Sequence, residues 1–166
     1  MMTINKLPQP VIAKINGVAT AAGCQLVAAC DLALASDSSK FATSGINIGL
    51  FCSTPAVALS RNVSRKRAME LLLTGDFIDA HTALDWGLIN RVVSLEKIDE
   101  ETHKFVEKIL LKSSEAIFIG KKMFYKQIEH NLEEAYEYAA KIMAKNMMSE
   151  DVKVGIDTFF KKRQES

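Results

Sequence analysis

The chain has 166 residues, 48% hydrophobic and 25% charged, a balance typical of one soluble globular domain or a piece of a larger one. Its 21 basic and 20 acidic side chains leave a formal net charge of +1, which argues against a general nucleic-acid-binding protein. Apolar runs end well before the roughly 18 residues that a membrane span needs, and no apolar segment typical of a signal peptide or other targeting segment opens the chain.

The first sixty residues are rich in small side chains and poor in charge. An apolar run behind Pro10 predicts a buried strand near residues 11–15, which the Asn16-Gly17 pair ends. A tight turn and a closely packed helix are expected within residues 19–30, and a second buried strand near residues 32–35. Strand, helix and strand in this order indicate a parallel βαβ unit.

The rest of the chain is charged and periodic. Residues 41–51 are expected to form a loop, and Pro55 favours a helix from about residue 54 to 61. Ser64 and Asp79 are candidate N-caps of two further helices, and residues 88–93 predict a short strand. From residue 95 onward apolar residues recur every three or four positions, which predicts helices only, to residue 164. We therefore expect a core region over residues 1–93 and a helical region over residues 94–166.

The cysteines and histidines show no metal-ligand spacing. Cys24, Cys30 and Cys52 are odd in number and form no C-x-x-C pair, so a disulfide framework or a structural zinc site is not expected. We predict buried or reduced thiols in a reducing compartment. The remaining candidates for metal binding lie far apart in sequence and are predicted to be surface helix residues: His81, His103 and His130.

The informative stretch runs from Asn16 to Leu26, where small residues end a strand and open a helix. Backbone N–H groups at a helix N-terminus can stabilise negative charge, such as that of a thioester carbonyl becoming an enolate. A helix packed closely on a sheet also requires small residues, so the pattern alone leaves both interpretations open. A dinucleotide-binding loop is excluded, because no G-x-G-x-x-G is present.

Residues 10–36 (PVIAKINGVATAAGCQLVAACDLALAS) resemble the signature of the enoyl-CoA hydratase/isomerase (crotonase) family: P-x-I-A, then N-G-x-A-x-G-G-G-x-E-L, then C-D. Residues 41–49 are similar to its F-x-x-P-E-x-x-x-G loop. Residues 68–88 resemble its A-x-x-L-x-L-T-G-x-x-I-x-A-x-x-A-x-x-x-G-L block, and residues 151–163 its closing D-x-x-E-G-x-x-A-F-x-x-K-R. Four motifs in the family's order span nearly the whole chain.

The resemblance implies an α/β fold, the ClpP/crotonase-like spiral of ββα turns, here its second half only, followed by C-terminal covering helices. It implies an acyl-CoA thioester as ligand, with coenzyme A as part of the substrate and no further cofactor or metal. It also implies a homo-trimer or hexamer, located in mitochondria in a eukaryote or in the cytoplasm in a bacterium. The first half of the spiral, one oxyanion-hole donor and most coenzyme A contacts are expected upstream of this segment.

The resemblance also assigns roles to individual residues. The backbone N–H of Ala22, at the middle glycine of the family's G-G-G, is expected to contribute to the oxyanion hole. The remaining substrate-binding candidates by motif position are Thr20, Ala21, Gly23, Ser44 and Ile48.

Two positions depart from the chemistry of a hydratase, which uses two glutamates to activate water and to handle the α-proton. The first glutamate position holds Gln25, which does not titrate, and the second holds Gly45, which has no side chain. We expect that restoring both glutamates could restore hydration only where the upstream half is present. Nearby polar residues that could substitute for a base are Thr43, Ser44, Asn47, Cys52 and Ser53.

Three functions therefore remain open from the sequence. The chain could be a crotonase-type lyase or isomerase acting on a fatty-acyl-CoA in lipid metabolism. It could be a non-catalytic acyl-CoA-binding or regulatory homologue, or an inactive fragment without a ligand. In each case we expect no hydration of crotonyl-CoA by this chain.

Overall fold

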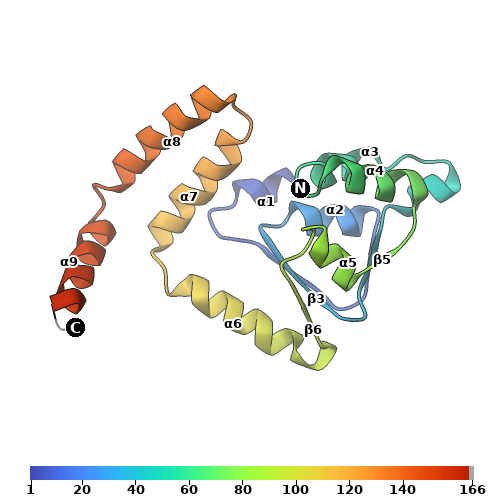
Figure 1. The fold of residues 1–166 in the computed structure, drawn as a ribbon, viewed down its shortest axis with the longest axis horizontal. Coiled ribbons are helices and arrows are strands. Elements are labelled where there is room, and N and C mark those ends of the chain that lie inside the picture. Colours follow the sequence, from blue (N-terminus) through green and yellow to red (C-terminus); the bar gives the residue numbers. More distant parts are fainter. Residues whose placement is uncertain (165–166) are drawn as a thin grey trace. The chain divides into compact units, whose positions relative to one another are not determined.

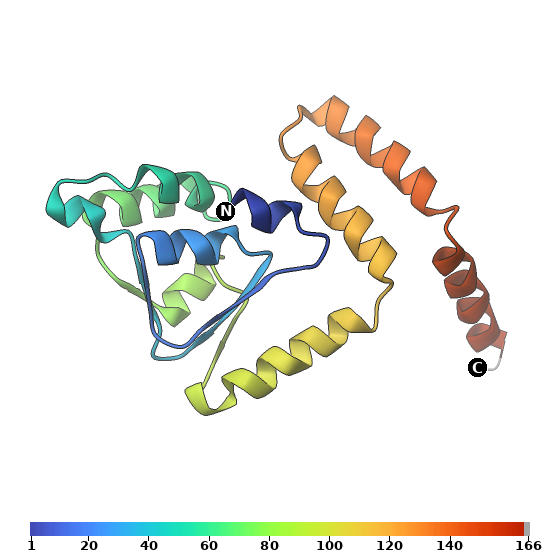
Figure 2. The same ribbon diagram turned by 180° about the vertical axis from the view of Figure 1, so that it is seen from behind.

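A computed structural model describes residues 1–164, and by its internal contacts the chain forms two units, Met1–Ile109 and a second that begins at Leu110. Figures 1 and 2 show the elements from opposite sides. The first unit contains α1 (Met2–Lys6), β1 (Ile12–Ile15), β2 (Val18–Thr20), α2 (Ala22–Ala29), β3 (Leu32–Ser36), β4 (Lys40–Ala42), α3 (Ser53–Leu59), α4 (Arg65–Thr74), β5 (Ile78–Asp79), α5 (Ala80–Asp85), β6 (Arg91–Val93) and most of α6 (Ile98–Leu110). Two 3₁₀ turns, Ser44–Ile48 and Leu95–Lys97, complete it.

Two small sheets follow from a repeated strand–strand–helix unit. In one sheet β3 lies between β1 and β6, and both pairings are parallel, with Ile12 opposite Leu32. In the other sheet β4 lies between β2 and β5, and β2 pairs with β4 in parallel. The first two turns of chain, β1–β2–α2 and β3–β4 with the helices after it, each add one strand to each sheet, whereas β5 and β6 are separated by α5. The pairing of β1 with β3 confirms the expected parallel strands near residues 11–15 and 32–35.

The second sheet differs from the prediction in two ways. A turn was expected to begin at residue 19 and a loop at residue 41, yet residues 18–20 form β2 and residues 40–42 form β4. In addition, β5 pairs antiparallel with β4 over two residues, whereas only parallel pairing was expected in this block. All three strands are two or three residues long, too short for the alternation of apolar and polar residues that identifies a strand.

The core of the first unit is formed where small residues allow α2 to lie close to the strands. Cys24, Val27 and Ala28 form the buried face of α2. Phe41, Leu59 and Leu71 come from β4, α3 and α4 and belong to the same buried cluster. Helix α3 packs on α2 and α4 lies beside α3, as Figures 1 and 2 show. A close-packed helix was one sequence interpretation of the small residues, and it holds for this face of α2.

Helix boundaries follow the predicted caps with one exception. The Asp79 carboxylate accepts a hydrogen bond from the Thr82 backbone N–H at 2.7 Å, which caps α5 as expected. Ser64 occupies the N-cap position of α4, but its hydroxyl accepts no capping hydrogen bond. Gly75 ends α4 in the left-handed conformation with φ of 68°.

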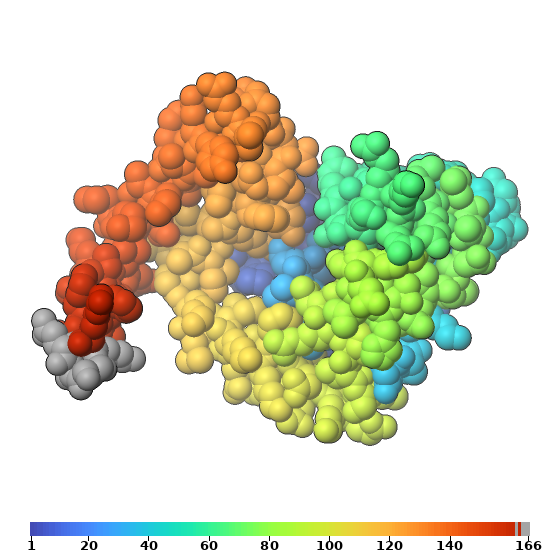
Figure 3. All heavy atoms as spheres, viewed as in Figure 1, coloured from blue at the N-terminus to red at the C-terminus, as the bar shows by residue number. Residues whose placement is uncertain are grey.

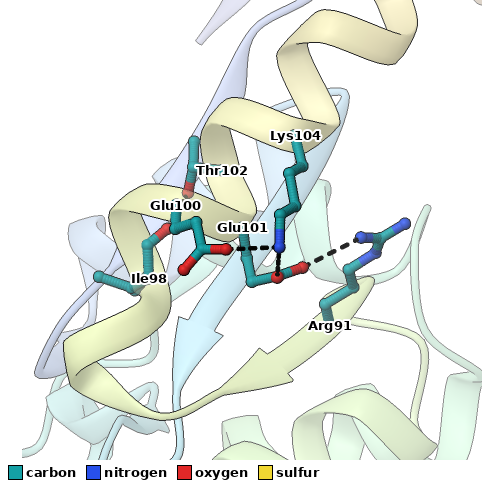
Figure 4. A network of polar contacts seen from close by, with 6 residues as sticks. All are labelled: Arg91, Ile98, Glu100, Glu101, Thr102 and Lys104. Atoms are coloured by element: carbon teal, nitrogen blue, oxygen red, sulfur yellow. Dashed lines mark hydrogen bonds and ion pairs between the residues drawn. The ribbon is translucent and has the colours of Figure 1, made fainter.

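Helix α6 is attached to the strands of the first unit by charged groups, shown in Figure 4. Lys104 on α6 bonds to Glu100 at 2.6 Å and to Glu101 at 2.9 Å, and Glu101 lies 3.9 Å from the Arg91 guanidinium of β6. Arg91 also lies 4.4 Å from the centroid of the Phe105 ring. Lys14 of β1 pairs with Asp99.

The second unit is helical throughout its described residues, as the sequence predicts. It contains α7 (Ser114–Gln127), α8 (Leu132–Asn146) and α9 (Glu150–Gln164), joined by short turns. Ser113 and Asn131 cap α7 and α8 through hydrogen bonds to Ala116 N–H and Glu134 N–H. Neither α7 nor α8 buries any residue fully, so within this segment the helices form no closed core of their own.

Candidate functional site

The start of α2 is set by an alanine in an unusual backbone conformation. Ala21 has φ of 49° and ψ of −113°, and it is the one residue other than glycine with positive φ in the described part of the chain. Its N–H donates to the Ala42 carbonyl of β4 at 3.0 Å, which ties the turn to the neighbouring strand. Side chains disfavour this region by about 1–3 kcal/mol, so glycine is the ordinary residue here.

This turn leaves the first residues of α2 accessible. Ala22 and Gly23 are exposed, and a Cβ added at Gly23 would contact no atom within 4 Å. The first N–H groups of a helix have no partner within that helix. Close packing therefore does not explain Gly23 within the described residues, and the small side chains at positions 22 and 23 leave the helix start open.

Gln25 lies one turn further along α2 and is half-buried. Its Oε1 accepts a hydrogen bond from the Thr54 hydroxyl of α3 at 3.3 Å. Because helical side chains incline toward the helix N-terminus, Gln25 lies on the same face of α2 as Ala22. With its oxygen turned to Thr54, the amide presents Nε2 as a donor, and it can neither take up nor release a proton at neutral pH.

A hydroxyl pair links the end of β2 to the loop after β4. The hydroxyls of Thr20 and Ser44 lie 2.8 Å apart, and either one can donate. This contact and the hydrogen bond from Ala21 to Ala42 bring the two motif segments together. Five predicted site residues thus lie in one connected region: Thr20, Ala21, Ala22, Gln25 and Ser44.

Gly45, at the second glutamate position, is enclosed by its own loop. A Cβ at this residue would lie 2.6 Å from the Leu50 carbonyl oxygen and 2.7 Å from the Cys52 Sγ, both closer than Cβ atoms normally approach other atoms. The expectation that a glutamate placed here could act as a base therefore does not hold for this loop conformation, because the first atom of the side chain has no space.

The other polar residues of the loop are engaged in holding the fold. The buried Thr43 hydroxyl donates to the Leu71 carbonyl of α4 at 2.7 Å. The Asn47 amide donates to the Gly75 carbonyl at 3.5 Å, and the Ser53 hydroxyl donates to the Phe51 carbonyl at 3.3 Å. None of these groups is positioned by a titrating partner that would make it a base.

Ile48 does not join the other predicted site residues. It is 83% exposed, next to exposed Leu50 and Phe51 in the loop after β4, whose cyan atoms lie at the right edge of Figure 3. The role of Ile48 in substrate binding stays a prediction.

The two segments that form the region carry no charged side chain. Residues 15–30 and 41–60 contain no Asp, Glu, Lys, Arg or His. The titratable groups there are the thiols of three cysteines, of which Cys24 and Cys52 are buried. Burial, and secondarily the nearby Cys52, raises the pKa of the Cys24 thiol to about 12, so that Cys24 stays protonated and is not a nucleophile at neutral pH.

Sequence analysis missed two groups of this region. Thr54 was assigned only as part of a helix start, yet its hydroxyl orients the Gln25 amide. The Leu50 carbonyl faces Gly45, and no sequence signal identifies a backbone group. No cluster of side chains in residues 1–164 has the composition to hold a metal ion.

The profile of the enoyl-CoA hydratase/isomerase family matches residues 1–166, so the chain belongs to that family. Its fold is accordingly the crotonase fold in part, with helices following. The predicted family resemblance is thus confirmed.

Among relatives, the chain is 49% identical over 164 residues to enoyl-CoA hydratase domain-containing protein 3, mitochondrial, of Xenopus laevis, covering 99% of this chain and 56% of that protein. The human protein of the same name is also 49% identical over 164 residues, covering 99% of this chain and 54% of the relative. The chain therefore spans about half the length of the curated relatives it matches.

Solved structures of proteins named as enoyl-CoA hydratases share this fold. A crystal structure of an enoyl-CoA hydratase of Mycobacterium smegmatis matches with a TM-score of 0.95 and 53% identity, over 97% of this chain and 63% of that one. The human enoyl coenzyme A hydratase domain-containing protein 3 matches with a TM-score of 0.93 and 50% identity, over 97% of this chain and 64% of that one. None of the described helices combines the length and apolar character that a bilayer span requires.

Proposed function

We propose that this chain binds a fatty-acyl-CoA thioester at the start of α2 and does not hydrate it. Membership of the enoyl-CoA hydratase/isomerase family supports an acyl-CoA ligand. The observation that carries the proposal is the accessible helix start, where the turn at Ala21 leaves Ala22 and Gly23 exposed while Gln25 and Gly45 stand at the two glutamate positions.

The thioester carbonyl oxygen is the group that suits this helix start. The Ala22 N–H would donate to that oxygen, and the small methyl group of Ala22 and the lack of a side chain at Gly23 allow the thioester to approach the backbone. Thr20 and Ser44, whose hydroxyls hold each other, would line one side together with Ala21. Coenzyme A is part of the ligand, and no other cofactor is needed.

Gln25 would act as a neutral hydrogen-bond donor to the acyl group rather than as a base. Its oxygen is engaged by Thr54, and the two segments around it carry no ionisable group apart from thiols. An acyl group with a carboxylate would lose water on entering the site, and the two segments offer no positively charged side chain in return. The site therefore favours acyl groups without a second carboxylate.

Isothermal titration calorimetry with butyryl-CoA tests the binding. We expect butyryl-CoA to bind measurably more tightly than free coenzyme A, because only the thioester offers an oxygen to the Ala22 N–H. The variant Ala22→Pro removes this N–H at a first helical position. Because proline also restricts the backbone of the residue before it, which is Ala21 in its unusual conformation, the Tm of the variant is measured beside its affinity. We expect it to reduce the affinity for butyryl-CoA to that for coenzyme A, and equal affinities in the unmodified chain would refute the proposal.

The hydration of crotonyl-CoA, followed as the loss of enoyl-thioester absorbance, tests the second half of the proposal. Removing a general acid–base group costs about 10²–10⁴ in rate, and such losses are not additive within one site. Without a base at positions 25 and 45 we expect no turnover above background. Robust turnover would show that another residue supplies the base, with Ser44 and Asn47 the first to be replaced.

A crotonase-type lyase or isomerase reaction is the second candidate. It is favoured by the accessible Ala22 N–H, which could stabilise an enolate formed without a protein base, as in loss of carbon dioxide from a carboxyacyl-CoA. The neutral surroundings weigh against a carboxylated acyl group. Release of carbon dioxide from malonyl-CoA by the purified chain would favour this candidate over binding alone.

The proposed location follows the names of the relatives, and the proposed assembly follows the family resemblance. The printed names of the relatives from Xenopus laevis and human include the word mitochondrial. We propose the same compartment if the source is eukaryotic and the cytoplasm if it is bacterial, with a homo-trimer or hexamer as the assembly. Expression of the full-length protein in cells of its source, with a fluorescent marker at the C-terminus, tests the compartment.

A further inference from the structure

The loop that contains Gly45, at the position that the resemblance assigns to the second glutamate, leaves no space for a side chain there. An ideal Cβ at Gly45 would lie 2.6 Å from the Leu50 carbonyl oxygen and 2.7 Å from the Cys52 Sγ. The first of these atoms belongs to the backbone, so it cannot move away as the end of a flexible side chain could. Position 45 is therefore closed to every residue except glycine unless the loop shifts.

The loop is tied to itself in a way that opposes such a shift. The Leu50 N–H donates to the Gly45 carbonyl, and the Gly49 N–H donates to the Ile46 carbonyl, both at 3.0 Å. Gly49 turns the chain with φ of 79°. The carbonyl of Cys52 accepts from the Ala56 N–H at 3.0 Å, which anchors the far end of the loop in the first turn of α3.

The N-terminal part of the loop, residues 43–47, is held against the C-terminal end of α4. A Cβ at Gly75 would lie 2.7 Å from the Ile46 Cγ2 and 2.8 Å from the Asn47 Oδ1, so the loop lies directly against this glycine. Asn47 also donates to the Gly75 carbonyl, and Thr43 donates to the Leu71 carbonyl of the same helix. The loop thus has anchors on both sides of the turn that encloses Gly45.

We infer that residues 45–52 fold into the space of the family's second carboxylate, and that Cys52 and the Leu50 carbonyl close this space to any side chain at position 45. The Leu50 carbonyl oxygen and the Cys52 Sγ occupy the space that the first side-chain atom of a glutamate at position 45 would need. No acid–base residue can be introduced at position 45 by substitution alone. This inference rests on the proposed function only for its catalytic consequence, since the closure itself is a property of the fold.

A double-mutant cycle on thermal unfolding tests the closure without any ligand. Gly45→Ala adds the single Cβ, and Cys52→Ala removes the Sγ but keeps the Cβ. We expect Gly45→Ala to lower Tm by roughly 3–10 °C, in line with overpacking of an enclosed position. In the Cys52→Ala background the same change should lower Tm by less, because the contact with Sγ is removed while that with the Leu50 carbonyl oxygen remains.

Gly17→Ala is the matched control, because a Cβ there meets no atom within 4 Å. It should leave Tm unchanged or raise it slightly, since alanine restricts the unfolded chain more than glycine does. A Gly45→Ala variant as stable as the control would overturn the closure. Equal losses in both backgrounds would overturn the role assigned to Cys52.

Amide hydrogen exchange on the unmodified chain tests the same loop if Gly45→Ala does not fold. The Leu50 N–H, which donates to the Gly45 carbonyl, should exchange much more slowly than the exposed backbone of a loop. Exchange of Leu50 at the rate of an unstructured amide would show an open loop and overturn the inference. Because none of these measurements uses acyl-CoA, failure of the proposed binding leaves their outcome unaffected.

The hydration rate and the Tm of a double variant test the consequence of the closed position 45 for catalysis. Gln25→Glu with Gly45→Glu should show no crotonyl-CoA hydration and a lower Tm than Gln25→Glu alone. Hydration by the double variant at an undiminished Tm would overturn the inference, because it would require a second carboxylate seated where the loop leaves no space.

Discussion

Ala21 retains a backbone conformation that glycine adopts readily and alanine does not. The Ala21 N–H donates to the Ala42 carbonyl, and the Ala21 carbonyl accepts from the Gln25 N–H. These two hydrogen bonds hold the residue from both sides. The family signature places glycine here, and the structure gives the reason, since φ is positive. The turn therefore persists at some cost in stability, in the segment that the proposed ligand approaches.

Replacing this residue tests that cost. Ala21→Gly should raise the free energy of unfolding by about 1 kcal/mol, because the relief of strain exceeds the greater chain entropy of glycine in the unfolded state. Urea unfolding followed by circular dichroism measures the change. Ala58→Gly, within helix α3 and with ordinary φ, is the control and should lower stability by about 1 kcal/mol. A destabilised Ala21→Gly would contradict the strain.

The residues of the site could be located in the sequence only in part. The order of the motifs identified Gln25 and Gly45 as the two departures from a hydratase. It also named Thr20, Ala22 and Ser44 as candidates for one site. The closure around Gly45 could not be predicted, because it depends on a backbone carbonyl five residues away and on the path of the loop. The partner of Gln25 was missed for a similar reason, since Thr54 is 29 positions further along the chain.

At the scale of elements, α6 is held by an ion-pair network rather than by buried apolar contacts alone. Hydrogen bonding from Lys104, followed by the charges of Lys104 and Arg91, keeps the pKa of Glu101 below its ordinary value. Hydrogen bonds to Glu100 and then Glu101 raise the pKa of Lys104. The side chains of Lys104 and Glu100 are exposed, so solvent weakens these contacts, and they orient α6 more than they stabilise the fold.

The depressed pKa of Glu101 gives stability a defined pH dependence. A carboxyl whose pKa is lower in the folded state stabilises at neutral pH, and this contribution is lost as pH falls through the folded-state pKa, below the ordinary value of about 4.3. Glu101→Gln should therefore lower the urea midpoint at pH 7 and have a smaller effect at pH 3. Glu96→Gln is the control, and an equal effect of Glu101→Gln at both pH values would exclude this ion-pair contribution.

The longer elements were predictable and the shorter strands were not. Helices α4 to α8 follow the apolar periodicity and cap residues of the sequence, and β1 and β3 are apolar runs. Strands β2, β4 and β5 are defined by pairing with each other, as Ala19 with Phe41 and Phe41 with Ile78. Such pairing depends on contacts distant in sequence, and local preference does not specify it.

At the scale of the whole chain, apolar side chains remain uncovered on the second unit. Phe159 and Phe160 are 62% and 56% exposed and contact each other edge to face, with Ile156 one turn away. Helices α7 and α8 also expose large apolar residues: Phe118, Phe124, Ile128, Leu132, Tyr136 and Met143. Isolated helices with faces of this kind are not expected to remain unpartnered in water.

We expect the purified chain to associate rather than to remain a monomer. Light scattering coupled to size-exclusion chromatography should give a mass of several times 18.3 kDa. Phe159→Ser together with Phe160→Ser should reduce the associated fraction, because these rings supply much of the exposed apolar area of α9. Thr158→Ser, on the same helix, is the control. A single peak at the mass of one chain would contradict the expectation.

The neutral stretches around α2 and the loop after β4 have a consequence for how binding responds to salt. Charged side chains are absent from residues 15–30 and 41–60, so added ions have nothing to screen near the proposed thioester site. The acyl and thioester part of a ligand should then bind with the same affinity at low and high ionic strength. Any weakening of acyl-CoA binding by salt would report on the phosphates of coenzyme A, and an acyl-pantetheine without those phosphates should show none.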